Sequence, residues 1–239
     1  MDTIIIILLL AILVICVWSG YKKGLVMGIG GILAIIISLY GANLLATAFS
    51  YEIVPALKPF AGGFVEQQIN ADDGVVYRMG WADYDYSVSD MLASNPGSVE
   101  KFCTECYEVI GIDENTSALM SQEAIDLINA GGDPVESVVE VLCERVSFVG
   151  CFILAFLLII IVLTVIGNLP NLSYKIPHLD TVNDLGGAVL GLVTGIMFCT
   201  ILVWVLKFTG KIIGADTLSG HWLTRLFLEK NFVTHYLGI

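Results

Sequence analysis

Four long stretches of this chain carry no charged side chain. They contain 19, 28, 29 and 22 residues and begin at Thr3, Gly24, Val146 and Leu185. A helix needs roughly 20 apolar residues to cross the hydrocarbon core of a bilayer, and it satisfies its backbone polar groups within the segment. The pattern therefore predicts four transmembrane helices, near residues 3–19, 25–48, 146–168 and 186–206.

The composition agrees with a membrane protein. Hydrophobic residues make up 56% of the chain and charged residues only 14%, against about 25% charged in a typical soluble domain. A cleaved signal peptide is the alternative for the first stretch, but such a peptide has positive charge before its apolar region. Here Asp2 precedes the stretch and Lys22 and Lys23 follow it, so we expect a membrane helix.

The residues between the second and third apolar stretches are strongly acidic. Residues 50–143 carry 17 Asp and Glu side chains against Lys58, Arg78 and Lys101, a net charge of −14 in a chain whose total is −12. This negative charge repels the phosphate backbone of nucleic acids. We therefore expect no nucleic-acid partner.

This acidic insert is expected to be mostly helical. Asp133-Pro134-Val135-Glu136 predicts a helix start, because Asp can cap, Pro fits the first turn and Glu lies three residues on. The helix it opens should continue into the third membrane helix. Ser121 and Ser98 are expected to cap two shorter helices, the latter reaching Ile110. Residues 74–88 lack a clear period and predict a loop.

Glycines recur every four residues in two apolar regions. One set is Gly20, Gly24 and Gly28, with Gly31 beyond it, and the other is Gly187, Gly191 and Gly195. A phosphate-binding loop needs a strand before its glycines, and a flexible linker is polar, whereas these glycines are embedded in Leu, Val and Ile. Helices in lipid associate through close backbone approach at small residues. Both sets therefore predict helix packing.

These glycines complete the expected architecture. Gly24, Gly28 and Gly31, continued by Ser38 and Ala42, should form one face of the second helix, and Cys199 should extend the other set. The predicted fold is an all-α membrane protein of two similar glycine-edged hairpins that pack through their second and fourth helices. The expected parts are a hairpin (1–49), the acidic helical insert (50–143), a second hairpin (144–209) and a tail (210–239).

The tail and the lysines bear on the membrane arrangement. Five tail residues form an apolar stripe typical of an amphipathic helix: Leu218, Trp222, Leu223, Leu226 and Phe227. The bare count of basic residues does not decide orientation, but the first hairpin usually dominates and its short loop holds Lys22 and Lys23. We expect this loop in the cytoplasm, and the N-terminus, the acidic insert and the C-terminus outside it.

Cys103 and Cys106 form the one CxxC in the chain. Three interpretations stay open: an inert helix face, a disulfide if the insert lies outside the cytoplasm, and a metal or redox site. A single pair is a weak metal signal, and the neighbouring Glu105 and Glu108 raise rather than lower a thiol pKa. We expect no bound metal and no cofactor.

Two segments resemble the colicin V production protein family. GYKKGLV is similar to the opening of that family, with Gly20, Lys23 and Gly24 matching its glycine and basic positions. IPHLDTVNDLGGAVLGLVTG resembles its segment in which Asp or Asn precedes a run of glycines, and Asn183, Gly187, Gly191 and Gly195 match it. The resemblance covers about residues 1–50 and 145–225. The insert, residues 52–140, is longer and more acidic than the usual connection.

The resemblance implies a small bacterial inner-membrane protein needed for production or export of a peptide toxin, with a wider envelope role and no catalytic residues. We expect a non-enzymatic scaffold that contacts lipid and assembles with itself or with other membrane proteins. An oligomeric channel or transporter component is the alternative, although the four apolar cores lack the ionisable residues that coupled transporters use as relays. A redox or metal protein using Cys103 and Cys106 is third.

Overall fold

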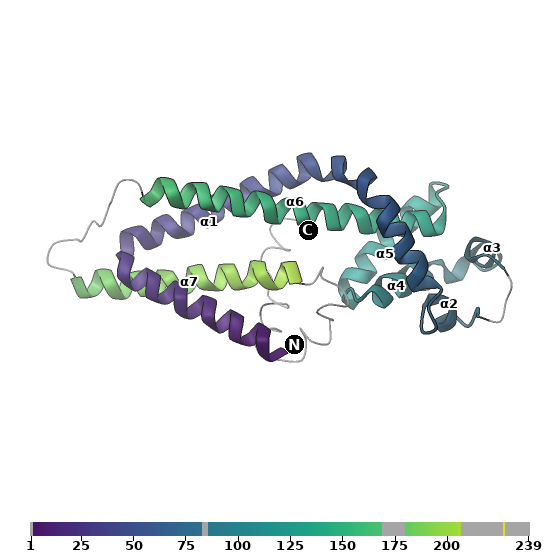
Figure 1. Ribbon diagram of the computed structural model, residues 1–239, viewed down its shortest axis with the longest axis horizontal. Helices are drawn as coiled ribbons and strands as arrows, with labels where there is room; N and C mark the ends of the chain where they lie inside the picture. The colour runs from purple at the N-terminus through teal and green to yellow at the C-terminus, as the bar shows by residue number, and fades with distance from the viewer. Residues whose placement is uncertain (1, 83–85, 169–179, 207–226, 228–239) are drawn as a thin grey trace. The chain divides into compact units, whose positions relative to one another are not determined.

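The structure is a computed structural model that describes residues 2–82, 86–168, 180–206 and 227. Every regular element among these residues is a helix (Figure 1). The elements are α1 (Asp2–Ile69), α2 (Val75–Arg78), α3 (Val88–Ser94), a 3-10 turn (Pro96–Ser98), α4 (Val99–Ile110), α5 (Glu114–Asn129), α6 (Pro134–Asn168) and α7 (Asp180–Leu206). The predicted amphipathic tail lies outside the described residues, except for Phe227.

Three of the described helices are long and apolar enough to cross a membrane, with spans at Thr3–Ile69, Pro134–Gly167 and Thr181–Leu206. The sequence predicted four, and the difference lies in α1, which contains the first two predicted spans. Gly24 inside α1 has φ 77° and ψ 178°, so two helices meet there at a kink. Figure 1 shows the purple N-terminal segment of α1 turning sharply into the segment that follows.

The chain divides into two compact units. Of the described residues, the first comprises those within Met1–Thr47 and Gly150–Leu206, and it contains the larger parts of the three long helices. Aromatic side chains of α6 and α7 pack edge to face inside it: the ring centroids of Phe152 and Trp204 are 5.1 Å apart. Outside, this unit exposes large apolar side chains such as Ile15, Leu154 and Leu185, as a surface solvated by lipid does.

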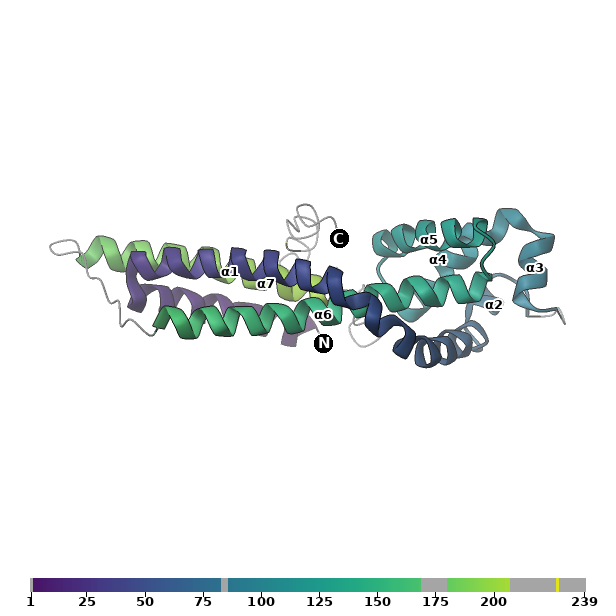
Figure 2. The same ribbon diagram turned by 90° about the horizontal axis from the view of Figure 1, so that it is seen from above.

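The second unit, Ala48–Val149, has a core of its own. Figure 2 shows α4, α5 and the start of α6 lying alongside one another within it. Its buried side chains come from the last turns of α1 and from all these helices, including Val65, Phe102, Met120 and Val138. The Tyr107 hydroxyl donates a 3.2 Å hydrogen bond to the Val138 carbonyl, which joins α4 to α6.

The first residues of the helices in this unit can be compared with the helix starts predicted at Asp133 and Ser121. Asp133 Oδ1 accepts from the backbone N–H groups of Val135 and Glu136 at 2.9 and 3.1 Å, and α6 runs unbroken to Asn168, which confirms the predicted start and continuation. The predicted start at Ser121 is wrong, because α5 begins at Glu114 with the Asp113 side chain accepting from Thr116 N–H.

Two further local predictions were half right. The helix predicted to reach Ile110 is α4, Val99–Ile110, but Ser98 makes no side-chain capping bond, and its hydroxyl donates to the Asn95 carbonyl instead. The segment predicted as a loop over 74–88 contains the short helix α2.

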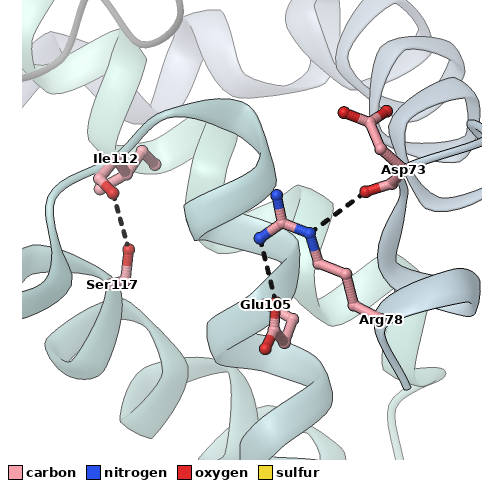
Figure 3. A network of polar contacts seen from close by, with 5 residues as sticks. All are labelled: Asp73, Arg78, Glu105, Ile112 and Ser117. Atoms are coloured by element: carbon pink, nitrogen blue, oxygen red, sulfur yellow. Dashed lines mark hydrogen bonds and ion pairs between the residues drawn. The ribbon is translucent and has the colours of Figure 1, made fainter. Parts of the chain in front are cut away.

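Among the described residues, three ion pairs join helices of the second unit, which we call the acidic unit. Lys58 of α1 lies 3.4 Å from Glu140 of α6, and Arg145 of α6 pairs with Glu123 of α5. Arg78 of α2 reaches Glu105 of α4 at 3.3 Å and donates from Nε to the Asp73 carbonyl at 3.1 Å (Figure 3). Lys58, Arg78 and Arg145 are therefore placed between elements, where each offsets repulsion among carboxylates, whereas Lys101 is exposed on α4.

Candidate functional site

The candidate site is a close crossing of two helices in the first unit, which we call the membrane unit. The segment of α1 before Gly24 crosses α7 (Figure 1). A Cβ atom on Gly20 would lie 2.8 Å from the Gly191 Cα and would collide with the Gly187 carbonyl oxygen. A Cβ atom on Gly187 would lie 2.8 Å from the Gly24 Cα. Only glycines allow the two backbones to approach this closely.

The contact continues along both helices in antiparallel order. A Cβ atom on Gly191 would collide with the Cys16 carbonyl oxygen, and one on Gly195 would lie 3.1 Å from the Cys16 Cβ. Further along, the Cys199 thiol is 3.6 Å from the Leu9 carbonyl oxygen. As the residue number rises on α7 it falls on α1, so one face of α7 is in contact with the first segment of α1 over several turns.

A hydrogen bond made by the buried Asn183 side chain lies at one end of this crossing. The Asn183 side chain, on the first turns of α7, accepts a 3.0 Å hydrogen bond at Oδ1 from the backbone N–H of Leu25. Leu25 opens the helix that follows the kink, so its N–H has no partner within that helix. A Cβ atom on Gly24 would lie 2.9 Å from Asn183 Oδ1. The absence of a side chain at Gly24 therefore makes room for the asparagine.

The glycine face of α7 packs against a different part of the chain from the one expected. The sequence predicted packing between the second and fourth apolar helices through Gly24, Gly28 and Gly31. In the structure the α7 glycines meet the helix before the kink. A Cβ atom on Gly28 would lie 2.9 Å from the Leu190 side chain, whereas one on Gly31 would meet no heavy atom of the described residues within 4 Å. The expectation for Gly31 is therefore corrected.

The kink is the physical reason for this correction. Because Gly24 is not helical, the four-residue spacing of Gly20, Gly24 and Gly28 does not trace one face of one helix. After the kink the buried face of α1 passes through Gly28, Ile35, Ser38 and Ala42, so the predicted continuation through Ser38 and Ala42 is buried. Gly41 lies beside α6, where a Cβ atom would meet the Ile159 Cδ1 at 2.8 Å.

The lysines next to the kink are on the surface. Lys23 is exposed, and Lys22 Nζ lies 5.1 Å from the centroid of the Trp18 ring. A cation over an indole face is an attractive pair. The motif lysine therefore takes no part in the helix crossing, unlike Gly20, Gly24 and Asn183.

Cys103 and Cys106 lie elsewhere, in the core of the acidic unit. Both are free thiols on α4 and both are buried. Burial raises the pKa of Cys103 to about 12, and burial together with the charges of Cys103 and Glu105 raises the pKa of Cys106 further. Protonated, buried thiols are poor nucleophiles and poor metal ligands. Across the described ranges no group of three or more His, Cys, Asp or Glu could hold a metal ion.

Sequence reasoning missed two partners of the site. Leu13 and Cys16 receive the α7 glycines, and neither residue type distinguishes a packing position from a lipid-facing one. The partner of Asn183 was also missed, because a backbone N–H carries no sequence signal. The clue in the sequence was Gly24, since a glycine that ends one helix leaves the next helix with uncapped backbone N–H groups.

Comparison with known proteins gives a match to a family model. No curated protein and no solved structure matches the chain. The family model described as Colicin V production protein matches residues 120–229, a region that includes α7 with Asn183, Gly187, Gly191 and Gly195. This match supports the resemblance of the chain to the colicin V production protein family that the sequence motifs predicted.

Proposed function

We propose that this chain is a non-enzymatic scaffold of the bacterial inner membrane that supports production or export of a colicin V-type peptide, with a wider role in the cell envelope. One observation carries the proposal. The residues that stand out in the sequence, Gly20, Gly24, Asn183, Gly187 and Gly191, are all used to hold one helix against another. Residues used in this way build a rigid bundle.

We further propose that the two parts of α1 cross the bilayer as separate spans. Residues 3–21 and 24–51 are each free of charge, and each part is long enough to cross. The reversal at Gly24 then lies at one membrane surface, with Lys22 and Lys23 exposed beside it. With α6 and α7 this makes a four-span bundle of two hairpins. The first hairpin usually dominates orientation, and its loop holds Lys22 and Lys23, which favours the cytoplasm for the Gly24 side and the outside for the acidic unit.

The outward surface of the bundle is apolar and can contact either lipid or a partner protein. Exposed Ile15, Leu154 and Leu185 cover it, and these side chains are as compatible with a neighbouring helix as with lipid. The proposed scaffold therefore acts by assembling with itself or with other membrane proteins.

Peptide export from cells tests the function. Cells that produce a colicin V-type peptide and lack their own copy of this gene are given the wild-type gene, a Gly20→Leu/Gly191→Leu variant, or a Gly30→Leu control. Gly30 is exposed, and a Cβ atom there would meet no atom of the part of the chain that the structure describes within 4 Å. We expect the wild type and the control to restore secreted peptide and the double variant to fail. If the wild-type gene restores no more peptide than an empty vector, the proposed function is wrong.

Thiol labelling tests the orientation. A cysteine is placed at exposed Ser94 of the acidic unit or at exposed Tyr21 beside the kink, and intact cells with a permeable outer membrane receive an impermeant maleimide. We expect Ser94→Cys to react and Tyr21→Cys to react only after the cells are broken. The reverse pattern would place the acidic unit in the cytoplasm. Ion flux through vesicles containing only this protein would favour an oligomeric channel instead.

A further inference from the structure

The last part of α1 exposes an apolar face that has no place in the core of the acidic unit. We name it the phenylalanine face; it consists of Phe49, Ile53, Phe60 and Phe64, which are 57%, 40%, 80% and 42% exposed. Their spacing of four, seven and four residues places them on one side of a helix. No charged residue belongs to this face.

The side chains on the opposite side of the same helix are buried in the core or paired with another helix. Val54, Val65 and Ile69 are buried in the core of the acidic unit, and Lys58 is paired with Glu140 of α6. Rotating the helix to hide the phenylalanines would pull these side chains out of the core and break the ion pair. The phenylalanine face therefore points outward as a consequence of the fold.

This face is continuous with the part of α1 that can cross the bilayer. Counted from Leu25, roughly 20 residues fill the hydrocarbon core, so Phe49 falls about one turn beyond its edge. Phe64 is 15 residues further on, and a straight helix would carry it about 22 Å farther from the core. Pro55 and Pro59 lie between the two, and each removes a backbone hydrogen bond and bends a helix.

We propose that the phenylalanine face docks on the membrane surface, with its rings in the headgroup region beside the point where α1 leaves the bilayer. The prolines let this part of the helix run along the surface, and the bilayer is the apolar phase nearest to it in the chain. The net charge of −14 over residues 50–143 opposes contact with anionic lipid, so the favoured surface is zwitterionic. This inference requires only that α1 crosses the bilayer and is independent of the scaffold role.

Photocrosslinking identifies the occupant directly. The full-length protein with Phe60→p-benzoylphenylalanine is reconstituted in phosphatidylcholine vesicles, irradiated and analysed by mass spectrometry. Tyr77→p-benzoylphenylalanine is the matched control, because Tyr77 is an exposed aromatic of the same unit that belongs to α2 and not to the phenylalanine face. Exposed Leu154 of α6 is the lipid-contact standard. We expect lipid adducts at position 60 at a yield approaching that at 154 and at least several times that at 77.

Three results would overturn the proposal. Position 60 could form adducts with a protein chain, which would make the face a protein interface. Its lipid yield could equal that at position 77. Replacing part of the phosphatidylcholine with phosphatidylglycerol could raise the yield several-fold, which would mean that anionic headgroups recruit the unit. We expect the added anionic lipid to lower the yield at position 60 and to leave the yield at position 154 unchanged.

Discussion

Asn183 and Leu25 are 158 positions apart in the sequence and are joined by a 3.0 Å hydrogen bond from the Leu25 backbone N–H to Asn183 Oδ1. An asparagine commonly caps the helix that it precedes. Here the asparagine belongs to α7 and serves the helix of α1 that begins after Gly24. The contact thus joins the two parts of the chain that carry the glycine sets, at a position where Asn183 is buried.

Replacing Asn183 with leucine should destabilise the membrane unit. The variant keeps much of the volume but leaves the partly buried Leu25 N–H without its acceptor, which costs about 1 kcal/mol, the low end of the range for a buried group. We expect Asn183→Leu to lower the thermal midpoint of the detergent-solubilised protein, measured by circular dichroism. Thr181→Leu, at an exposed position two residues away, should leave it unchanged. Equal midpoints for both variants would show that the hydrogen bond contributes nothing.

Gly24→Ala should be more harmful than alanine at another glycine of α1. The backbone at Gly24 has φ 77° and ψ 178°, a region essentially restricted to glycine that costs other residues about 1–3 kcal/mol, and the new methyl group would press on Asn183. Gly30→Ala should stabilise slightly, because alanine is the better helix former. A Gly24→Ala protein as stable as Gly30→Ala would contradict the kink.

The helix crossing can be tested by placing a larger side chain at one of its glycines. Gly191→Leu would force a side chain between α7 and the Cys16 backbone, and lipid offers no hydrophobic compensation for the lost contact. We expect loss of on the order of 1 kcal/mol or more, the scale of single interhelical contacts in membranes. The measurement is resistance to protease in detergent, with Gly30→Leu as control. Unchanged resistance of Gly191→Leu would remove the main support for the scaffold proposal.

Arg78 should contribute more to the stability of the acidic unit than the exposed Lys101 does. Its guanidinium joins α2 to α4 through Glu105 and also holds the Asp73 carbonyl. Because both partners are partly solvated, the loss from Arg78→Gln should be modest, about 0.5–1 kcal/mol. Lys101→Gln, which removes the same charge from an exposed position of α4, separates this loss from the general effect of net charge. The two variants should differ in urea midpoint, with Arg78→Gln lower.

The acidic unit should become more stable as the pH falls moderately below neutral. Burial, followed by the charges of Glu105 and Glu114, raises the pKa of Glu108 above its ordinary value. The folded state therefore binds the proton more tightly than the unfolded state, and the ionised Glu108 at neutral pH costs stability. We expect Glu108→Gln to raise the thermal midpoint at pH 7 and to weaken its rise between pH 7 and pH 5. A lower midpoint for the variant at pH 7 would reverse the assigned sign.

Local features of the chain were predictable where local chemistry determines them. The apolar stretches that became α6, α7 and the two parts of α1 follow from the absence of charge over about 20 residues. The start of α6 follows from Asp133 and Pro134, because a cap needs only its own neighbours. The start of α5 was not predicted correctly, because local chemistry did not determine it. Asp113 and Ser121 are both competent caps, and packing decided between them, since Ser121 is buried and bonds to Thr104 of α4.

The sequence by itself determined that this chain is helical, apolar and divided by an acidic insert, and it singled out the glycines and Asn183. Only the tertiary structure decided what those residues touch. Small residues permit close approach to any neighbouring helix, so spacing alone could not show that Gly187 and Gly191 meet Gly20 rather than Gly28 and Gly31. The partner was selected by the reversal at Gly24, because one non-helical residue changes which faces the two parts of α1 present to α7.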